Sequence, residues 1–189
     1  TDWCGTTEHQ GLLALMPPFP YVSCEALLTA ITRPTLLLIL DRIQDPYNFG
    51  AMLRSAEVFG VDAVLIGSTG QCEITPHVAR SSAGAVHHLT VCRTASLIAA
   101  VHELRHDHGI TIVAAAGDAP VTAADFSYRE PTAFVIGNEG TGIAPELRSL
   151  STAAVRIPQA GHVGSLNAAV AAGILLYEAF RQRAVRPLD

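Results

Sequence analysis

Three segments of the chain combine polar side chains with turn-forming residues, and each one follows an apolar run. The first leaves the run TLLLIL at Asp41 and continues to Gly50. Within it, Asn48 is a good helix N-cap, and Arg54 lies six residues further along. Taken alone, this pair fits a capped helix with one exposed arginine, so its chemistry depends on what the other segments bring beside it.

The second segment, residues 137–142 (GNEGTG), follows an apolar run that ends at Ile136. Its three glycines permit a tight turn whose backbone N–H groups can face a ligand. Because the pattern is neither GxGxxG nor a Walker loop, it gives no support to a nicotinamide or ATP site. An ordinary glycine-rich turn stays open as the alternative at this point.

The third segment, residues 157–167 (IPQAGHVGSLN), opens a long apolar-rich stretch. Ser165 and Asn167 could simply cap a helix there. The three segments offer no dedicated general base, and His162 is the single imidazole in them.

A fourth constellation, His102-Glu103-Leu104-Arg105-His106, matches HExxH, the zinc-hydrolase signature of two histidines one turn apart with a glutamate as base. A zinc-hydrolase helix runs through a core and is flanked by apolar residues, whereas charged residues crowd this segment and Gly109 ends it. Cationic side chains in a last helical turn are expected from the helix dipole. We therefore expect no metal, and a zinc hydrolase built on His102, Glu103 and His106 is a minor alternative.

Length and composition indicate one domain, or one domain with a small appendage. Of the 189 residues, 49% are hydrophobic and 15% are charged, which excludes a disordered chain or a fibre. The net charge is −5 and all 12 basic residues are arginines, so composition decides neither for nor against a nucleic acid. Four cysteines, at positions 4, 24, 72 and 92, have no CxxC spacing. We interpret them as reduced thiols of a cytoplasmic protein, since no signal peptide or membrane span is visible.

Apolar runs alternate with helical patterns, which predicts an α/β class with a mostly parallel sheet flanked by helices. We expect strands at 35–40, 63–66, 89–92, 110–115, 132–136 and 153–157. We expect helices from an Asn48 cap to Phe59 and at 24–30, 76–82, 96–106, 144–150 and 166–180. Residues 1–30 contain three prolines and lack a clear period, which is typical of a linker or arm before a unit at 31–189.

In this order and spacing, the three segments resemble the three motifs of the SpoU family of RNA ribose 2′-O-methyltransferases, in the SPOUT superfamily. The matching stretches are LDRIQDPYNFGAMLRSAEVFGVDAVLI, FVIGNEGTGI and VRIPQAGHVGSLNAAVAAGILLYEA. The resemblance covers residues 35–183, nearly all of the expected regular structure. His9-Gln10-Gly11 also resembles the segment that joins an N-terminal RNA-binding domain to the catalytic domain in the rRNA-modifying branch.

The resemblance implies a SPOUT fold, in which the C-terminal part of the sheet is tied in a deep trefoil knot. It implies a homodimer with the active site at or near the interface, and S-adenosylmethionine as the cofactor, bound within the knot. By position, the cofactor-binding residues are Ala115, Gly137, Asn138, Ile157 and Leu166. Residues 1–30 then become the remnant of a junction to an N-terminal RNA-binding domain, and 31–189 the catalytic domain.

The functional polar residues of the family carry over to Asn48, Arg54, Glu139, Ser165 and Asn167. The resemblance therefore predicts an enzyme that methylates the ribose 2′-hydroxyl of a guanosine in structured RNA, with rRNA favoured over tRNA. On this resemblance we expect neither DNA nor a membrane as a partner. We expect Arg54 to orient the ribose-phosphate and to stabilise the developing alkoxide. A non-catalytic RNA-binding or assembly protein of the same fold is the alternative from another class.

Overall fold

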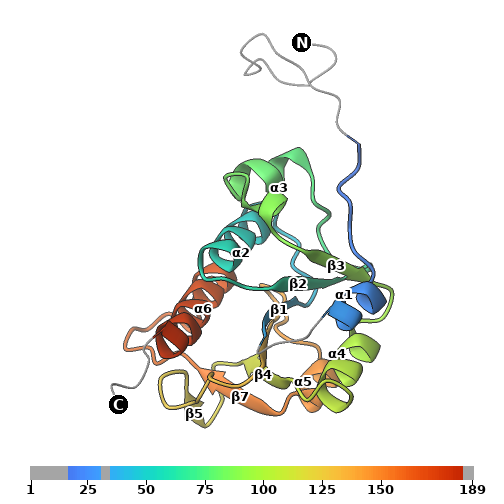
Figure 1. Cartoon of the computed structure of the whole chain (residues 1–189). Coiled ribbons are helices and arrows are strands. Elements are labelled where there is room, and N and C mark those ends of the chain that lie inside the picture. Colours follow the sequence, from blue (N-terminus) through green and yellow to red (C-terminus); the bar gives the residue numbers. More distant parts are fainter. Residues whose placement is uncertain (1–16, 31–34, 185–189) are drawn as a thin grey trace.

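The computed structural model describes residues 17–30 and 35–184 and contains one seven-stranded sheet (Figure 1). The strands are β1 (Leu36–Leu40), β2 (Ala63–Gly67), β3 (Val91–Thr94), β4 (Thr111–Ala115), β5 (Val121–Thr122), β6 (Thr132–Ile136) and β7 (Ala153–Arg156). The helices are α1 (Cys24–Ala30), α2 (Pro46–Val58), α3 (Pro76–Ser81), α4 (Leu97–His106), α5 (Pro145–Leu150) and α6 (Ala168–Ala184), with a short 3₁₀ helix at Ala85–His88. The predicted α/β class is confirmed.

All strand pairings in this sheet are parallel, in the order β3-β2-β1-β6-β4-β7-β5. Every residue of β1 and of β6 is buried, so the two strands in the middle of the sheet contact packed side chains on both faces. Continuous apolar strands of this kind belong in a parallel sheet that is covered on both sides.

Helices cover both faces of the sheet and divide the core into two clusters (Figure 1). On one face, α2 and α6 pack against sheet residues that include Leu38 and Phe134. On the other face, α1, α4 and α5 pack against residues that include Leu37 and Val135. Leu37 and Leu38 belong to opposite clusters because successive side chains of a strand point to opposite faces. Among the helices of the described ranges, none is long and apolar enough to cross a membrane.

The start of α2 requires a correction to the sequence prediction. Asp45 is the N-cap, and its carboxylate accepts a hydrogen bond from the N–H group of Tyr47 at 2.9 Å. The prediction that Asn48 caps this helix is wrong, because Pro46 at the first helical position places the helix start earlier. Asn48 lies in the first turn instead, where its amide can reach other segments.

Most other elements begin and end close to their predicted bounds. β3 begins at Val91 rather than at residue 89, and α6 runs from Ala168 to Ala184 rather than from 166 to 180. Hydrophobic periodicity does not indicate β5 or the 3₁₀ helix, because elements of two and four residues are too short to show a period.

Gly50 allows α2 and α3 to pack closely. A Cβ atom at Gly50 would lie 1.9 Å from Ser81 Oγ and 2.9 Å from the backbone nitrogen of Ser82. Ser81 is fixed in this position because its hydroxyl donates a hydrogen bond to the carbonyl of Pro46 at 3.0 Å. Any side chain at position 50 would therefore push α3 away from α2.

Replacing Gly50 by alanine should lower the free energy of unfolding by about 1–3 kcal/mol, the usual cost of overpacking. Gly173→Ala in α6 is the matched control, since its Cβ would meet Ser55 Oγ at 3.5 Å, an ordinary contact. The control should gain up to about 1 kcal/mol from helix propensity. Urea unfolding measures both values, and an equal effect of the two substitutions would contradict the close packing of α2 on α3.

Candidate active site

The three segments singled out in the sequence meet at one edge of the sheet. Because β1, β4, β6 and β7 run parallel, their carboxyl ends lie along the same edge, and the loops that follow them leave from there. The loops after β4, β6 and β7 surround a cavity of about 330 Å³. This volume lies within the range of small-molecule sites in proteins.

The cavity wall combines apolar side chains with glycine backbone. Its lining includes all five residues predicted to bind the cofactor, which are Ala115, Gly137, Asn138, Ile157 and Leu166. Glu139 and Ser165, both predicted catalytic residues, also line it. Among the lining residues in the described part of the chain, Glu139 is the one with a charged side chain.

Three of the predicted catalytic residues, one from each segment, are joined by hydrogen bonds. Asn167 Nδ2 donates to Asn48 Oδ1 at 2.9 Å, and Asn48 Nδ2 donates to Glu139 Oε1 at 3.2 Å. Asn167 also caps α6 as predicted, because its Oδ1 accepts from the N–H groups of Ala169 and Val170. We call this arrangement the amide–carboxylate chain. It fixes both amide orientations, since each oxygen accepts and each nitrogen donates.

Donors from the first segment surround the carboxylate of Glu139. The backbone N–H groups of Gln44 and Asp45 each lie 3.4 Å from it. Partial burial tends to raise the pKa of Glu139, but hydrogen bonds outweigh this effect and lower the pKa below its ordinary value. These bonds come from its own backbone, from the Asn48 amide and from the two N–H groups. Glu139 is therefore ionised at neutral pH and gives the cavity a negative charge.

Asn138 folds the second segment into a compact turn. Its Oδ1 accepts from the N–H group of Gly140 at 3.0 Å, and its Nδ2 donates to the carbonyl of Arg42 at 2.8 Å. A Cβ atom at Gly137 would lie 2.2 Å from the backbone nitrogen of Ile143, so the turn can close only with glycine at this position. The turn is thus tied both to itself and to the first segment.

Two further residues hold the site together and were not among the predicted site residues. Asp41 is buried at the end of β1, and its Oδ2 accepts from the N–H group of Ala144 at 2.7 Å. Arg42 forms an ion pair with Asp41 at 2.9 Å and donates to the carbonyl of Gly142 at 3.2 Å. The sequence signal is a charged pair placed directly after a fully apolar strand, at the edge where ligands bind.

Arg54 lies apart from the amide–carboxylate chain. It is exposed on α2 and does not line the cavity. Tyr47, Arg54 and Val58 are spaced so that they share one outer face of the helix, and Tyr47 and Val58 are also exposed. The structure therefore brings four predicted catalytic residues to the cavity or to the amide–carboxylate chain beside it. It places Arg54 on the outer face of α2.

The HExxH match does not build a metal centre within the described residues. His102 and His106 are exposed on α4, and their ring centroids lie 4.3 Å apart. Within residues 17–30 and 35–184, no group of three His, Cys, Asp or Glu side chains could hold a metal ion. The histidine pair thus lacks a third ligand in this part of the chain, and a zinc-hydrolase centre has no structural support.

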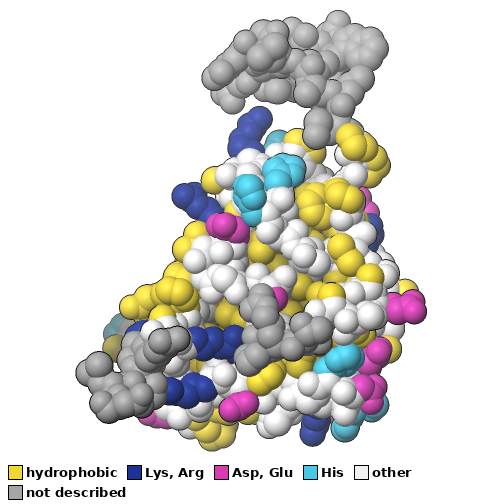
Figure 2. All heavy atoms as spheres, in the orientation of Figure 1, with side chains coloured by type: hydrophobic (Ala, Val, Ile, Leu, Met, Phe, Trp, Pro, Cys, Tyr) yellow, Lys and Arg dark blue, Asp and Glu magenta, His cyan; other side chains and the backbone are white. Residues whose placement is uncertain are grey.

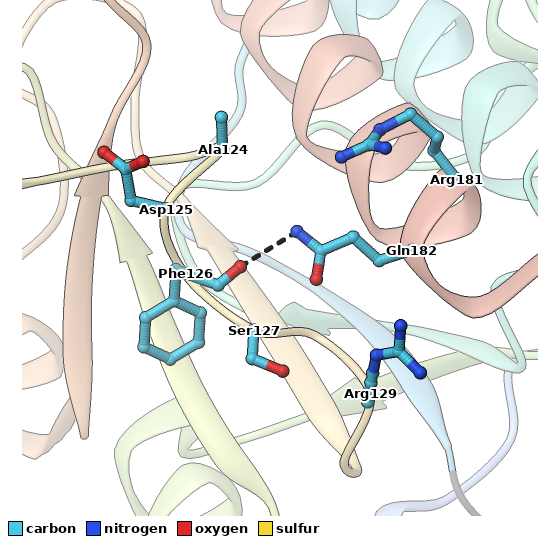
Figure 3. A pocket seen from close by; sticks show the side chains of 7 residues that line it. All are labelled: Ala124, Asp125, Phe126, Ser127, Arg129, Arg181 and Gln182. Carbon is cyan, nitrogen blue, oxygen red and sulfur yellow. Dashed lines mark hydrogen bonds between the residues drawn. The ribbon is translucent and has the colours of Figure 1, made fainter. Parts of the chain in front are cut away.

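A second cavity of about 330 Å³ lies between the loop after β5 and the C-terminal part of α6 (Figure 3). Gln182 reaches across it and donates to the carbonyl of Phe126 at 2.9 Å, while Arg181 forms an ion pair with Glu178 at 2.7 Å. None of the predicted site residues lines this cavity. We therefore assign the candidate site to the first cavity.

The profile of the SpoU rRNA Methylase family matches residues 35–177, a range that contains all three segments. Among curated proteins, the 23S rRNA (guanosine-2′-O-)-methyltransferase RlmB of Nitrosomonas europaea is 38% identical over 183 residues, covering 96% of this chain and 70% of that protein.

Solved structures of SpoU and TrmH/SpoU proteins are also similar to this chain. The SpoU methyltransferase AviRb from Streptomyces viridochromogenes, in complex with the cofactor AdoMet, matches 84% of this chain with a TM-score of 0.76 and 34% identity. The match covers 64% of the AviRb chain, so this chain spans less than two thirds of that protein. The TrmH/SpoU tRNA modifying enzyme of A. aeolicus matches 85% of this chain and 84% of its own, with a TM-score of 0.73 and 26% identity.

Proposed function

This chain belongs to the SpoU rRNA methylase family, and from that premise we propose that it methylates the ribose 2′-hydroxyl of a guanosine in rRNA. The predicted family is confirmed, and with it, at the level of the family, the RNA methyltransferase class and the S-adenosylmethionine cofactor. The observation that carries the proposal is the amide–carboxylate chain, which lies beside the cavity that all five predicted cofactor residues line.

The residues around the cavity fit S-adenosylmethionine in shape and in charge. Apolar side chains such as Ile157 and Leu166 offer a surface for a flat base, and five glycines on the wall leave backbone groups accessible. The ionised carboxylate of Glu139 is the charge complement of a sulfonium cation. We propose that the backbone of Gly137, Asn138 and Ile157 holds the cofactor.

The residues of this chain would act by positioning. Bound S-adenosylmethionine supplies a methyl group on a positively charged sulfur, which becomes a neutral thioether after transfer. Holding the ribose hydroxyl in line with that methyl group can supply as much as about 7–11 kcal/mol of the barrier. Glu139, Ser165 and Asn167 would fix the loop geometry and the ribose. Glu139 and Ser165 line the cavity from two segments, and Asn167 belongs to the amide–carboxylate chain beside it.

Arg54 would act on the RNA rather than on the cofactor. An arginine side chain stays protonated in proteins, so it is suited to bind a phosphate and to stabilise the alkoxide that forms as the hydroxyl loses its proton. The exposed position of Arg54 on α2 supports this assignment, because a phosphate of structured RNA can approach it from solvent.

Guanosine in rRNA is proposed as the substrate because the relative at 38% identity is named a 23S rRNA (guanosine-2′-O-)-methyltransferase. The solved tRNA modifying enzyme of A. aeolicus keeps tRNA as the alternative. The segment His9-Gln10-Gly11, on which the sequence argument for rRNA and for a junction at 1–30 depends, lies outside the described residues. We propose the catalytic domain at 31–189 on the sequence pattern and on the family match at 35–177.

A trefoil knot in the C-terminal part is also proposed. Its support is the path of the chain after β6: it forms α5, adds β7 on the far side of β4, and then returns past the turn after β6 to pack α6 against α2. The loops after β6 and β7 therefore line one cavity although α5 and β7 separate them in the sequence.

A homodimer is proposed from an exposed apolar stripe on α6 and just before it. Val170, Ile174 and Tyr177 follow helical spacing on α6 and are exposed, and Figure 2 shows apolar side chains on the surface where α6 lies. Leu166, also exposed, lies two residues before the helix. Phe59 at the end of α2 extends this stripe, since its ring lies 5.9 Å from that of Tyr177. Because Leu166 also lines the cavity, a second copy seated on the stripe would lie against the cofactor site.

Calorimetric titration of the chain with S-adenosylmethionine should give saturable binding of one cofactor per chain. Leu166→Trp should abolish this binding because the larger side chain fills part of the cavity, and exposure of Leu166 lets the variant fold. Val163→Trp, an exposed neighbour that does not line the cavity, is the control and should bind normally. If the folded wild-type chain binds no cofactor, the non-catalytic RNA-binding alternative replaces the enzyme.

The dimer is tested by Ile174→Asp, which should convert the chain from dimer to monomer in sedimentation velocity, since a buried unpaired carboxylate opposes association. Ile98→Asp is the matched control. Both isoleucines are exposed, at 38% for Ile174 and 45% for Ile98, but Ile98 lies on α4 on the other face of the sheet. A wild-type chain that sediments as a monomer would contradict the proposed dimer.

Arg54→Lys should reduce methyl transfer about 10- to 100-fold, the loss of roughly one charge-assisted hydrogen bond, and should not abolish it. The assay follows labelled methyl groups into 23S rRNA and into tRNA, where each 2′-O-methyl group makes the adjoining phosphodiester bond resistant to alkali. It thereby also separates the two substrates. Complete loss of transfer with RNA binding intact would instead favour Arg54 as the proton acceptor.

A further inference from the structure

Cys24 and Cys92 lie side by side although 68 positions separate them in the chain. Their Sγ atoms are 2.6 Å apart, whereas a disulfide bond has a length of about 2.05 Å. Cys24 begins α1, and Cys92 is the second residue of β3. A small movement of either side chain would bring the two sulfurs to bonding distance.

The backbone already holds these two parts of the chain together. Val22 forms a parallel bridge to Cys92, and its N–H group donates to the carbonyl of Val91 at 2.9 Å. Two residues later the chain enters α1, which buries Leu27 and Leu28 in the same core cluster as Cys92. The two thiols are therefore neighbours because the fold places them together.

The two thiols differ in exposure and in acidity. Cys24 is half-buried and reachable from solvent, whereas Cys92 is fully buried. Hydrogen bonds from the Cys92 thiol and from the Thr94 hydroxyl lower the pKa of Cys24, although burial opposes them. The hydrogen bond to Cys24, together with burial, raises the pKa of Cys92. This is the division expected between an attacking thiol, which must be accessible as thiolate, and a resolving thiol, which must only be adjacent.

We propose that Cys24 and Cys92 are a redox-active dithiol that a low-molecular-weight disulfide, such as oxidised glutathione, converts into an intramolecular disulfide. The Cys24 thiolate attacks one glutathione sulfur, forms a mixed disulfide and releases the first glutathione thiolate. Cys92 Sγ then attacks Cys24 Sγ and displaces the second glutathione thiolate, which takes up the proton of Cys92. The protein loses two electrons and two protons, and one glutathione disulfide is reduced to two thiols.

The disulfide would fasten residues 22–30 to the edge strand β3. In the reduced chain this attachment rests on the Val22 bridge and on the two leucines of α1. A covalent link across 68 positions restricts the unfolded chain and so stabilises the folded one. The dithiol is separate in space from the proposed site of methyl transfer, because neither cysteine lines the proposed cofactor cavity.

The test uses the full chain with Cys4 and Cys72 replaced by serine, so that only the proposed pair remains. It is equilibrated with glutathione buffers of increasing oxidised fraction and quenched with acid. Its free thiols are then alkylated in denaturant, so that the buried Cys92 is reached, and its intact mass is measured. We expect a reversible species that lacks the mass of two hydrogens, takes up no alkylating reagent and has a higher melting temperature than the reduced form. Peptide mapping without reductant should join the peptides that contain Cys24 and Cys92.

Two single variants in the same background identify the roles of the thiols. Cys92→Ala should trap glutathione on Cys24, and Cys24→Ser should leave Cys92 unmodified in the folded chain, because that thiol is buried. Persistent glutathione on Cys24 while Cys92 is present would overturn the proposal. Two free thiols in the most oxidising buffer would overturn it as well. Because Cys24 is half-buried, the Cys24→Ser variant should fold, and its melting curve checks that the substitutions leave the fold intact.

Discussion

Parallel pairing between β1, β6, β4 and β7 is the constraint on which the candidate site depends. Leu40 lies opposite Ile136 in the register, so the residues that follow these strands start beside each other, and the N–H group of Asp41 donates to the carbonyl of Ile136 at 2.9 Å. An antiparallel partner would have sent one of these loops to the opposite edge. Segments almost a hundred residues apart therefore meet through the sheet, before any of their polar side chains interact.

Hydrogen bonds then determine the shape of that edge. Loops that leave a buried sheet carry backbone groups that need partners, and here side chains supply them: Asp41 binds the start of α5, Asn138 closes its own turn, and Glu139 accepts from the loop after β1. Each bond contributes only about 0.5–1.5 kcal/mol, but a buried group left without a partner costs about 1–3 kcal/mol. The arrangement is therefore stable as a set, and the cavity exists because the loops around it are held apart and in place.

Most strands and helices, and the cap of α6, could be predicted from the sequence because local residue patterns specify them. TLLLIL specifies a strand buried on both faces, and Asn167 before a long apolar stretch specifies a helix cap; the structure confirms both. The long-range pairs could not be read in the same way. Asn48 fits a cap by type, yet Pro46 transfers that role to Asp45, and its contact with Glu139 joins residues 91 positions apart, which no local period encodes. Asp41 was missed for the same reason, since its partner Ala144 lies 103 positions away.

The positions of the two charges, Glu139 and Arg54, fit the ligands that each would meet under the proposed function. The carboxylate of Glu139 lies on the cavity wall, where it is held by hydrogen bonds and faces the volume proposed for a sulfonium cation. The same charge at the RNA surface would repel phosphates. A guanidinium on the cavity wall would repel the proposed sulfonium cofactor, whereas Arg54, exposed on the outer face of α2, is placed where an RNA phosphate would replace its water if it has the proposed role. Under the proposed function, a chain with a net charge of −5 can bind both a cation and a polyanion, because Glu139 on the cavity wall and Arg54 on the outer face of α2 each act at short range.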